Sequence, residues 1–215
     1  IGSRFNHFLI DEFQDTSTLQ WHNMVPLMYD SLASEHTNLI VGDAKQAIYR
    51  FRGGEVDQFV ALPNVEADLA DIDFINAAFV RNADVQILEK NYRSAQEIIR
   101  FNNWFFEHFV LQNDRMSDKI KAVFSGFKQE EVRTATGLVT VDFLTKENDE
   151  ETLQDKIHEK VVEYIVECEQ DGYSLDDICI LIKTKKDGYL ITNYLVQKGY
   201  NVVSVDSVLD RKSVV

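Results

Sequence analysis

The feature that most constrains the fold is the alternation of short apolar runs with longer amphipathic segments. HFLI at 7–10 and NLIVGD at 38–43 have the length and composition of buried strands, and VQIL at 85–88 predicts a third. Between these runs, apolar residues recur at the three- and four-residue spacing of a helix buried on one face. Strands that alternate with helices favour a parallel sheet flanked by helices, so we expect an α/β fold.

Several helices can be placed by their boundaries. Ser17 and Gln20 have the spacing of a capping box, which predicts a helix that runs to about residue 31. A shorter helix is predicted over 56–62, just before a proline. The acidic stretch 64–84 also has helical apolar spacing and predicts an accessory helix with no assigned chemistry.

A second capping box is predicted at Ser94 and Glu97, where it would open a further helix. That helix has an apolar stripe at helical spacing, formed by Ile98, Phe101, Phe105 and Phe109. We expect the stripe to lie in the core.

The polar segment 112–136 predicts an irregular linker between a first domain, 1–111, and a second, 137–215. The second domain repeats the α/β pattern, with strands expected at LVTVDFL, DICILIK and NVVSV and helices over about 149–170 and 187–198.

Charge and cysteine content narrow the function classes. A net charge of -14 argues against a general double-stranded DNA binder covered in basic residues, but it leaves room for a local basic and aromatic groove. Cys168 and Cys179 are too few and too far apart for a disulfide framework, so we expect the reducing cytoplasm. No membrane association is expected, because no apolar run is long enough to span a bilayer.

Three carboxylates follow the first apolar run directly: Asp11, Glu12 and Asp15 in IDEFQDTS. Ligands of parallel α/β sheets sit at the carboxyl ends of strands. An Asp-Glu pair there suits phosphoryl transfer, since one carboxylate can hold Mg²⁺ and the other can activate the attacking water. The alternative is a solvated strand end followed by a helix cap.

The segment VGDAKQAIYRFRGG follows the second apolar run, so the amide of Gln46 is expected near the same ligand. Tyr49 and Phe51 alternate there with Arg50 and Arg52. Aromatic rings interleaved with arginines provide stacking faces and phosphate contacts for single-stranded nucleic acid. The alternative places both rings in the core.

LEKNYRS follows the third run and ends at the predicted helix start. Arg93 is placed to offer a guanidinium to a transferring phosphate, and Tyr92 to stack on a base. The alternative is a surface arginine at the start of a helix.

Together, IDEFQDTS, VGDAKQAIYRFRGG and LEKNYRS resemble motifs II, III and IV of the superfamily-one UvrD/Rep helicases, in that order. The residues within these motifs resemble the RecB/AddA branch of the superfamily more closely than UvrD itself. The resemblance implies a partial RecA-like P-loop NTPase fold. Residues 1–111 would form the C-terminal half of the first motor domain, and 137–215 the start of the second.

The resemblance also implies a role for each matching residue on the nucleotide side. Asp11 coordinates Mg²⁺, and Glu12 is the catalytic base. Gln14 and Asp15 complete the Walker B segment, and Gln46 contacts the γ-phosphate and couples the nucleotide state to DNA.

Further roles are implied for the remaining matches. Tyr92 lies against the adenine, and Arg93 acts as an arginine finger. Tyr49 and Phe51 stack on the bases of the bound strand, with Arg52 in support.

The implied activity is that of an ATP- and Mg²⁺-dependent DNA helicase or translocase in repair or recombination. It would act on single-stranded DNA and on single-strand/double-strand junctions, and a helicase-nuclease partner subunit is possible. The 215 residues contain no G-x-x-x-x-G-K-[ST] loop, so the resemblance implies a central fragment that is inactive alone. Two alternatives stay open: a non-catalytic module that binds single-stranded DNA or a partner, and a P-loop ATPase that acts on no nucleic acid. The Tyr49–Arg52 pattern disfavours the second.

Overall fold

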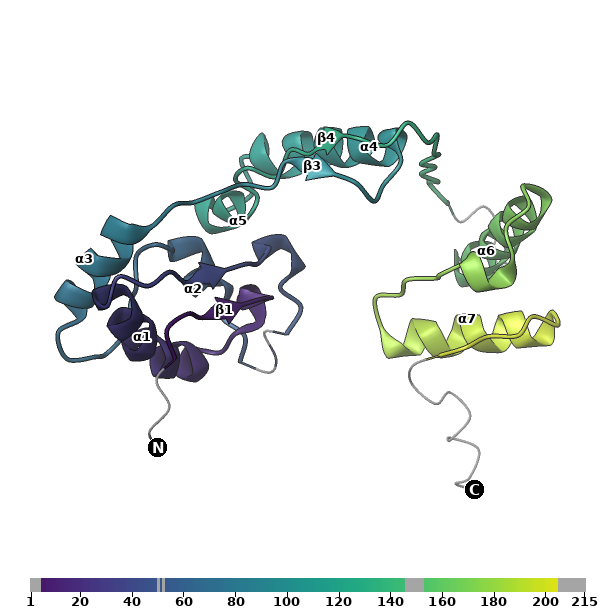
Figure 1. Ribbon diagram of the computed structural model, residues 1–215. Coiled ribbons are helices and arrows are strands. Elements are labelled where there is room, and N and C mark those ends of the chain that lie inside the picture. Colours follow the sequence, from purple (N-terminus) through teal and green to yellow (C-terminus); the bar gives the residue numbers. More distant parts are fainter. Residues whose placement is uncertain (1–4, 50, 52, 146–152, 205–215) are drawn as a thin grey trace, which may run out of the picture. The chain divides into compact units, whose positions relative to one another are not determined.

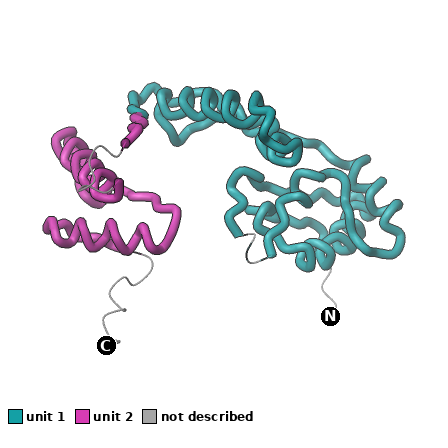
Figure 2. The backbone as a smooth tube through the Cα atoms, turned by 180° about the vertical axis from the view of Figure 1, so that it is seen from behind, with its two compact units in different colours: residues 1–139 teal, residues 140–215 magenta. Residues whose placement is uncertain are grey.

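The computed structural model describes residues 5–49, 51, 53–145 and 153–204. The chain divides into two compact units, residues 1–139 and 140–215 (Figures 1 and 2). It is a mixed α/β chain with small parallel sheets.

Unit 1 begins with a short parallel sheet. Strand β1 (Leu9–Ile10) pairs with β2 (Leu39–Ile40), so that the two strands run in the same direction. Backbone hydrogen bonds extend the pairing on both sides: Leu39 N–H donates to Phe8 at 2.8 Å, and Val41 N–H to Ile10 at 2.8 Å. The two strands predicted at HFLI and NLIVGD are therefore confirmed.

Helix α1 (Thr18–Ala33) connects the two strands. The predicted capping box is present, since Gln20 N–H donates to Ser17 Oγ at 3.3 Å and Ser17 N–H donates to Gln20 Oε1 at 2.9 Å. This arrangement satisfies backbone donors that the first helical turn leaves without partners.

The core of unit 1 lies between α1 and α3 (Ile72–Asn82). Trp21 of α1 meets Phe79 edge-to-face at 6.0 Å between ring centroids, and it meets Phe13 at 4.8 Å. The accessory helix predicted within 64–84 is thereby confirmed and has a packing role. Helix α2 (Val56–Ala61) covers the turn that follows β1, where Phe59 packs on Phe13.

The later part of unit 1 differs from the sequence expectation. Residues 85–88 are exposed and form no strand; β3 (Lys90–Asn91) comes next and pairs in parallel with β4 (Glu130–Glu131). The strand predicted at VQIL is therefore wrong. Its apolar composition favours a strand, but the neighbouring strand β4 pairs with Lys90 and Asn91 and not with residues 85–88.

Helix α4 (Gln96–Phe106) begins without the predicted capping box. Its N-cap is Ala95, and the carboxylate of Glu97 instead accepts the Gly137 backbone N–H at 2.7 Å. The expectation of a buried stripe on this helix is also wrong. Phe105 stacks on Phe109 at 4.9 Å, yet their side chains are 37% and 49% exposed.

Segment 112–136 is not irregular throughout. It contains α5 (Asp118–Val123) and β4, and its buried Phe127 lies 6.1 Å from Phe106 of α4. Between α4 and α5 the backbone continues as a π-helical segment, η4 (Glu107–Leu111).

The described part of unit 2 contains two helices and a short 3-10 turn: α6 (Leu153–Gln170), η5 (Leu175–Asp177) and α7 (Lys185–Gln197). Ile165 of α6 packs with Ile191 and Leu195 of α7 in a small core. The predicted start of the first helix, at 149, lies outside the described residues.

The strands predicted in the second domain are absent from its described part. Residues 138–144, 178–183 and 201–204 form no strand, and residue 205 lies outside the description. Some of their apolar side chains stay exposed, as Phe143 at 92% and Leu181 at 92% illustrate, whereas Ile178 and Val202 pack partly buried against the core of unit 2. Alternating apolar residues specify a strand only where a neighbouring strand satisfies the backbone.

Candidate functional site

The candidate site is built where β1 and β2 end. Asp11 and Glu12 follow β1 and lead into the 3-10 turn η1 (Phe13–Asp15), and Asp43 follows β2. Because the strands are parallel, both ends meet at one edge of the sheet. The Phe13 N–H donates to the Val41 carbonyl at 3.1 Å and joins the two segments beyond the last paired residues.

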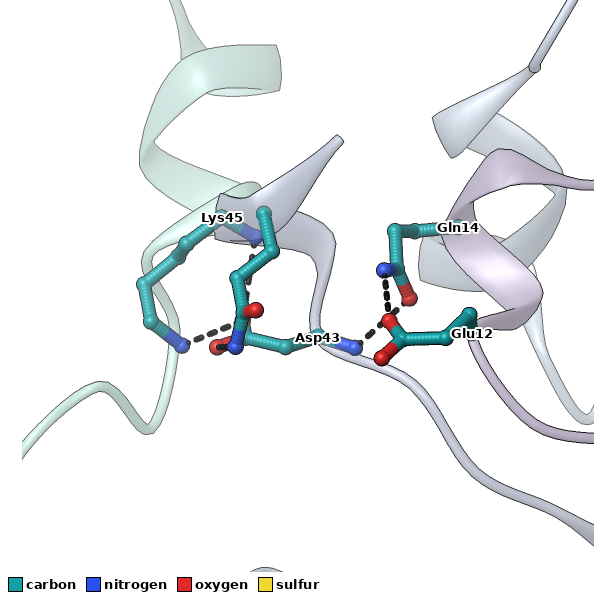
Figure 3. A network of polar contacts seen from close by, with 5 residues as sticks. Glu12, Gln14, Asp43 and Lys45 are labelled. Atoms are coloured by element: carbon teal, nitrogen blue, oxygen red, sulfur yellow. Dashed lines mark hydrogen bonds and ion pairs between the residues drawn. The ribbon is translucent and has the colours of Figure 1, made fainter. Parts of the chain in front are cut away.

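Gln14 ties the two strand ends together (Figure 3). Its amide nitrogen donates to Glu12 Oε2 at 2.6 Å, and its amide oxygen accepts the Asp43 backbone N–H at 3.0 Å. The residue is only 1% exposed. A buried amide used on both sides is a fixed link between the residues that it joins.

The carboxylate of Asp43 continues the network. Oδ1 accepts the Lys45 ammonium at 2.7 Å and the Lys45 backbone N–H at 3.0 Å, and Oδ2 accepts the Gln46 amide at 3.0 Å. Burial of the carboxyl raises its pKa, but the side-chain hydrogen bonds from Lys45 and Gln46, the Lys45 backbone N–H and the Lys45 charge together outweigh burial, so the pKa of Asp43 lies below its ordinary value. The carboxylate thus shapes the 3-10 turn η2 (Ala44–Gln46).

Glu12 has an unusual backbone conformation. Its φ of 51° and ψ of 41° lie in the left-handed region. A non-glycine residue in that region costs about 1–3 kcal/mol, and such residues cluster at functional sites. Glu12 is exposed to solvent, and Gln14 donates to one of its carboxylate oxygens.

The side chains at this edge of the sheet show what kind of metal ion they could hold. In the described part of the chain, no group of three or more His, Cys, Asp or Glu side chains lies close enough to hold a metal ion. Asp11 is exposed, and one of its oxygens accepts the Glu12 N–H at 2.9 Å. A single carboxylate suits Mg²⁺ that is shared with substrate phosphates and water, and does not suit an all-protein cage.

Asp15 lies at the end of η1 and is half-buried. Its Oδ1 is buried and has no hydrogen-bond partner among the described residues. Gln46 is exposed at the end of η2. The structure therefore joins Glu12, Gln14 and Gln46 in one network through Asp43, and it places Asp11 and Asp15 beside that network.

The predicted stacking residues follow η2. The Tyr49 and Phe51 rings lie 6.0 Å apart at 51°, and they are 38% and 78% exposed. This exposure disfavours the alternative in which both rings belong to the core. Arg50 and Arg52 lie outside the described residues.

Tyr92 and Arg93 follow a different sheet of unit 1 from the one that carries Glu12 and Asp43. They follow β3, which pairs with β4 rather than with β1 or β2, and both are exposed. Within the described ranges, no hydrogen bond or ion pair joins them to the network of Glu12 and Asp43. Their roles at the nucleotide therefore stay a prediction.

Sequence reasoning assigned no role to Asp43 or Lys45. An available signal was the Asp that ends the run NLIVGD, because an Asp after an apolar run commonly accepts the N–H two residues on and stabilises a turn, as Asp43 does here. The ion pair with Lys45 and the contact with Gln14 could be found only from the structure.

Comparison with known families adds to this geometry. A sequence model of the UvrD/REP helicase N-terminal domain matches residues 1–66, and one of the UvrD-like helicase C-terminal domain matches residues 87–214. Motifs II and III lie in the first match and LEKNYRS in the second. The chain belongs to the UvrD-like helicase family.

Named relatives support this assignment. The chain is 27% identical over 192 residues to an ATP-dependent helicase/nuclease subunit of Streptococcus thermophilus, a match that covers 83% of this chain and 14% of that protein. It is 27% identical over 219 residues to the ATP-dependent DNA helicase PcrA of Bacillus subtilis, covering 98% of this chain and 24% of the relative. The exonuclease/helicase subunit RexA of Streptococcus pneumoniae is 32% identical over 115 residues, or 51% of this chain and 8% of its own length.

The chain thus matches only a small part of the length of these relatives. Among the helices that the structure describes, none is long and apolar enough to cross a membrane.

Proposed function

We propose that the whole protein, meaning these residues together with a phosphate-binding loop, is an ATP-dependent DNA helicase or translocase. The observation that carries the proposal is the network Glu12–Gln14–Asp43–Gln46 at the ends of two parallel strands. Family membership and the names of the relatives support it.

In this proposal Glu12 is the catalytic base. Its carboxylate orients the attacking water and takes up a proton as the water adds to the terminal phosphate. Gln14 already holds one Glu12 oxygen, so the other is available to the water. Asp11 would hold Mg²⁺ together with phosphate oxygens, and the ion would neutralise charge that develops during transfer.

Gln46 is proposed to contact the terminal phosphate. Its amide nitrogen is anchored on Asp43, which leaves its carbonyl oxygen and second amide hydrogen for the ligand. Asp15 is proposed to have a structural or coupling role beside the base. Arg93 is proposed as an arginine finger and Tyr92 as an adenine contact.

The finer fold is also a proposal. We propose that the β1–β2 sheet is part of a RecA-like motor domain and that later residues start a second. We propose that residues 1–111 belong to the first motor domain and residues 137–215 to the second, joined by 112–136. The two family matches are separated by residues 67–86, so the alternative is a boundary that follows α3. LEKNYRS would then open the second motor domain.

Single-stranded DNA is the proposed track, with Tyr49 and Phe51 stacked on bases and Arg52 in support. We further propose action at single-strand/double-strand junctions, a repair or recombination role, and a helicase-nuclease partner subunit, because relatives are named as subunits of such an enzyme. The cytoplasm is the proposed location, where the free thiols of Cys168 and Cys179 stay reduced.

The test uses the purified whole protein. ATP hydrolysis is measured with and without single-stranded DNA, and strand separation is measured on a duplex with a single-stranded tail. DNA-stimulated hydrolysis coupled to strand separation is expected. DNA binding without hydrolysis would favour the non-catalytic module, and hydrolysis that DNA leaves unchanged would favour an ATPase that acts on no nucleic acid.

A further inference from the structure

We propose that Gln14 is a positioning residue that fixes the carboxylate of Glu12 and makes its orientation depend on the turn that carries Gln46. The inference rests on the proposed function, because it assumes that Glu12 is the base. It assigns a specific role to a buried side chain that lies between Glu12 and Asp43.

The first argument is the orientation of the Gln14 amide. Its nitrogen faces a carboxylate oxygen of Glu12 at 2.6 Å, and its oxygen faces the Asp43 N–H at 3.0 Å. Rotating the amide by half a turn would set oxygen against carboxylate and NH₂ against N–H, so only one orientation satisfies both neighbours. Gln14 is buried, so water does not compete for these contacts.

The second argument is the space beside Gln14. A Cβ atom added to Gly42 would lie 2.8 Å from Gln14 Oε1 and 3.3 Å from the Phe13 backbone nitrogen. The turn after β2 can therefore approach the amide only because residue 42 has no side chain. Close approach, rather than an unusual φ, is what this glycine provides.

The third argument is the continuity of the network. Asp43 accepts the Gln46 amide on its carboxylate and donates its own N–H to Gln14. A displacement of the Gln46 turn therefore acts on the Gln14 amide, and through it on Glu12. Displacing a catalytic base by about 1 Å can lower the reaction rate about 10²-fold. A small movement of the Gln46 turn, passed on through Asp43 and Gln14, would therefore be enough to change the rate.

The main test compares Gln14→Glu and Gln14→Met in the whole protein, assayed for DNA-stimulated ATP hydrolysis. We expect each to lower kcat by about 10²-fold at neutral pH while KM for ATP changes little. In Gln14→Glu two carboxylates face each other, which raises the pKa of one of them. Once that group is protonated it can donate to Glu12, so the activity of Gln14→Glu relative to wild type should rise as the pH is lowered. Gln14→Met has no such group, so its relative activity should not rise.

Two further variants separate positioning from folding. Ser31→Ala removes a buried hydroxyl near the end of α1, which donates to the Asn6 carbonyl at 2.6 Å and makes no contact with the network of Glu12 and Asp43 among the described hydrogen bonds. It should lower the melting temperature and leave kcat per folded molecule and its pH profile unchanged. Gly42→Ala keeps Gln14 but displaces its amide, so it should lower kcat with KM retained at every pH.

The outcomes are distinct. If Glu12→Gln is inactive but the Gln14 and Gly42 variants retain wild-type kcat per folded molecule, the positioning role is overturned and the proposed function stands. A pH-independent loss in Gln14→Glu, equal to that in Gln14→Met, would also overturn it. If the wild type shows no DNA-stimulated hydrolysis, or Glu12→Gln keeps full turnover, the proposed function fails and the inference fails with it.

Discussion

Glu12 shows at the scale of one residue how the site is held. Its left-handed backbone opposes folding by about 1–3 kcal/mol, and the hydrogen bond from Gln14 and the pairing around Phe13 hold it in place. A strained residue kept exposed at a strand end suits a base that must reach a ligand.

Asp43 gives a pH prediction. Because its folded-state pKa lies below its ordinary value, its ionised form stabilises the fold at pH above the unfolded pKa, and this contribution is lost as pH falls through the folded pKa. Asp43→Asn should therefore lower stability at neutral pH, and its difference from wild type should shrink only below the ordinary range of Asp. Unfolding of the 215-residue chain measured against pH tests this. A difference that stays constant down to the lowest pH would show that the charge of Asp43 contributes nothing.

Tyr49 and Phe51 give a second prediction. If they stack on DNA, changing either to Ala should weaken single-stranded DNA binding by about 1–3 kcal/mol and barely change the melting temperature. Phe79→Ala is the matched control: its buried ring should cost about 3–5 kcal/mol of stability and leave affinity per folded molecule unchanged. Binding is measured at a stated salt concentration in the whole protein. A large stability loss with unchanged affinity in the Tyr49 and Phe51 variants would refute stacking.

At the scale of elements, the serines that precede α1 and α4 offer a matched pair of substitutions. Ser17 caps α1 through its side chain, whereas Ser94 was predicted to cap α4 and does not. Ser17→Ala should destabilise the chain by about 0.5–2 kcal/mol, and Ser94→Ala should have almost no effect. Chemical denaturation of both variants measures the difference. Equal losses would mean that Ser94 caps its helix after all.

The same elements show what sequence can predict. β1, β2 and α1 were predictable because apolar runs and a local capping box depend on residues a few positions apart. The strand at 85–88 and the buried stripe of α4 were not, because both depend on distant partners that local pattern does not identify.

In the candidate site, too, some features could be predicted from local sequence and others depend on distant partners. Asp11, Glu12 and Gln46 could be recognised from their places after apolar runs and from the family resemblance. The joining role of Gln14 and Asp43 could not, because it depends on the orientation of one buried amide. The placement of Tyr92 and Arg93 beside these residues remains a prediction, since it requires an arrangement that local sequence pattern does not specify.

At the scale of the whole molecule, the chain carries the strand-end carboxylates but no G-x-x-x-x-G-K-[ST] loop. We predict that these 215 residues alone do not hydrolyse ATP at a measurable rate, because nothing in them cradles the phosphates in the way that loop does. A sensitive phosphate-release assay with added single-stranded DNA checks this. The Glu12→Gln variant is the control for phosphate release that does not come from the proposed site. Turnover that the substitution abolishes would contradict the prediction.

The central claim is that Glu12 is the base of a DNA-stimulated ATPase. The most direct test measures ATP binding and hydrolysis by the whole protein with single-stranded DNA, for wild type and Glu12→Gln. We predict that Glu12→Gln binds ATP nearly as wild type does and hydrolyses it about 10²–10⁴-fold more slowly, the usual contribution of a general base. Near-normal turnover in Glu12→Gln would contradict the account and leave Glu12 as a solvated strand end.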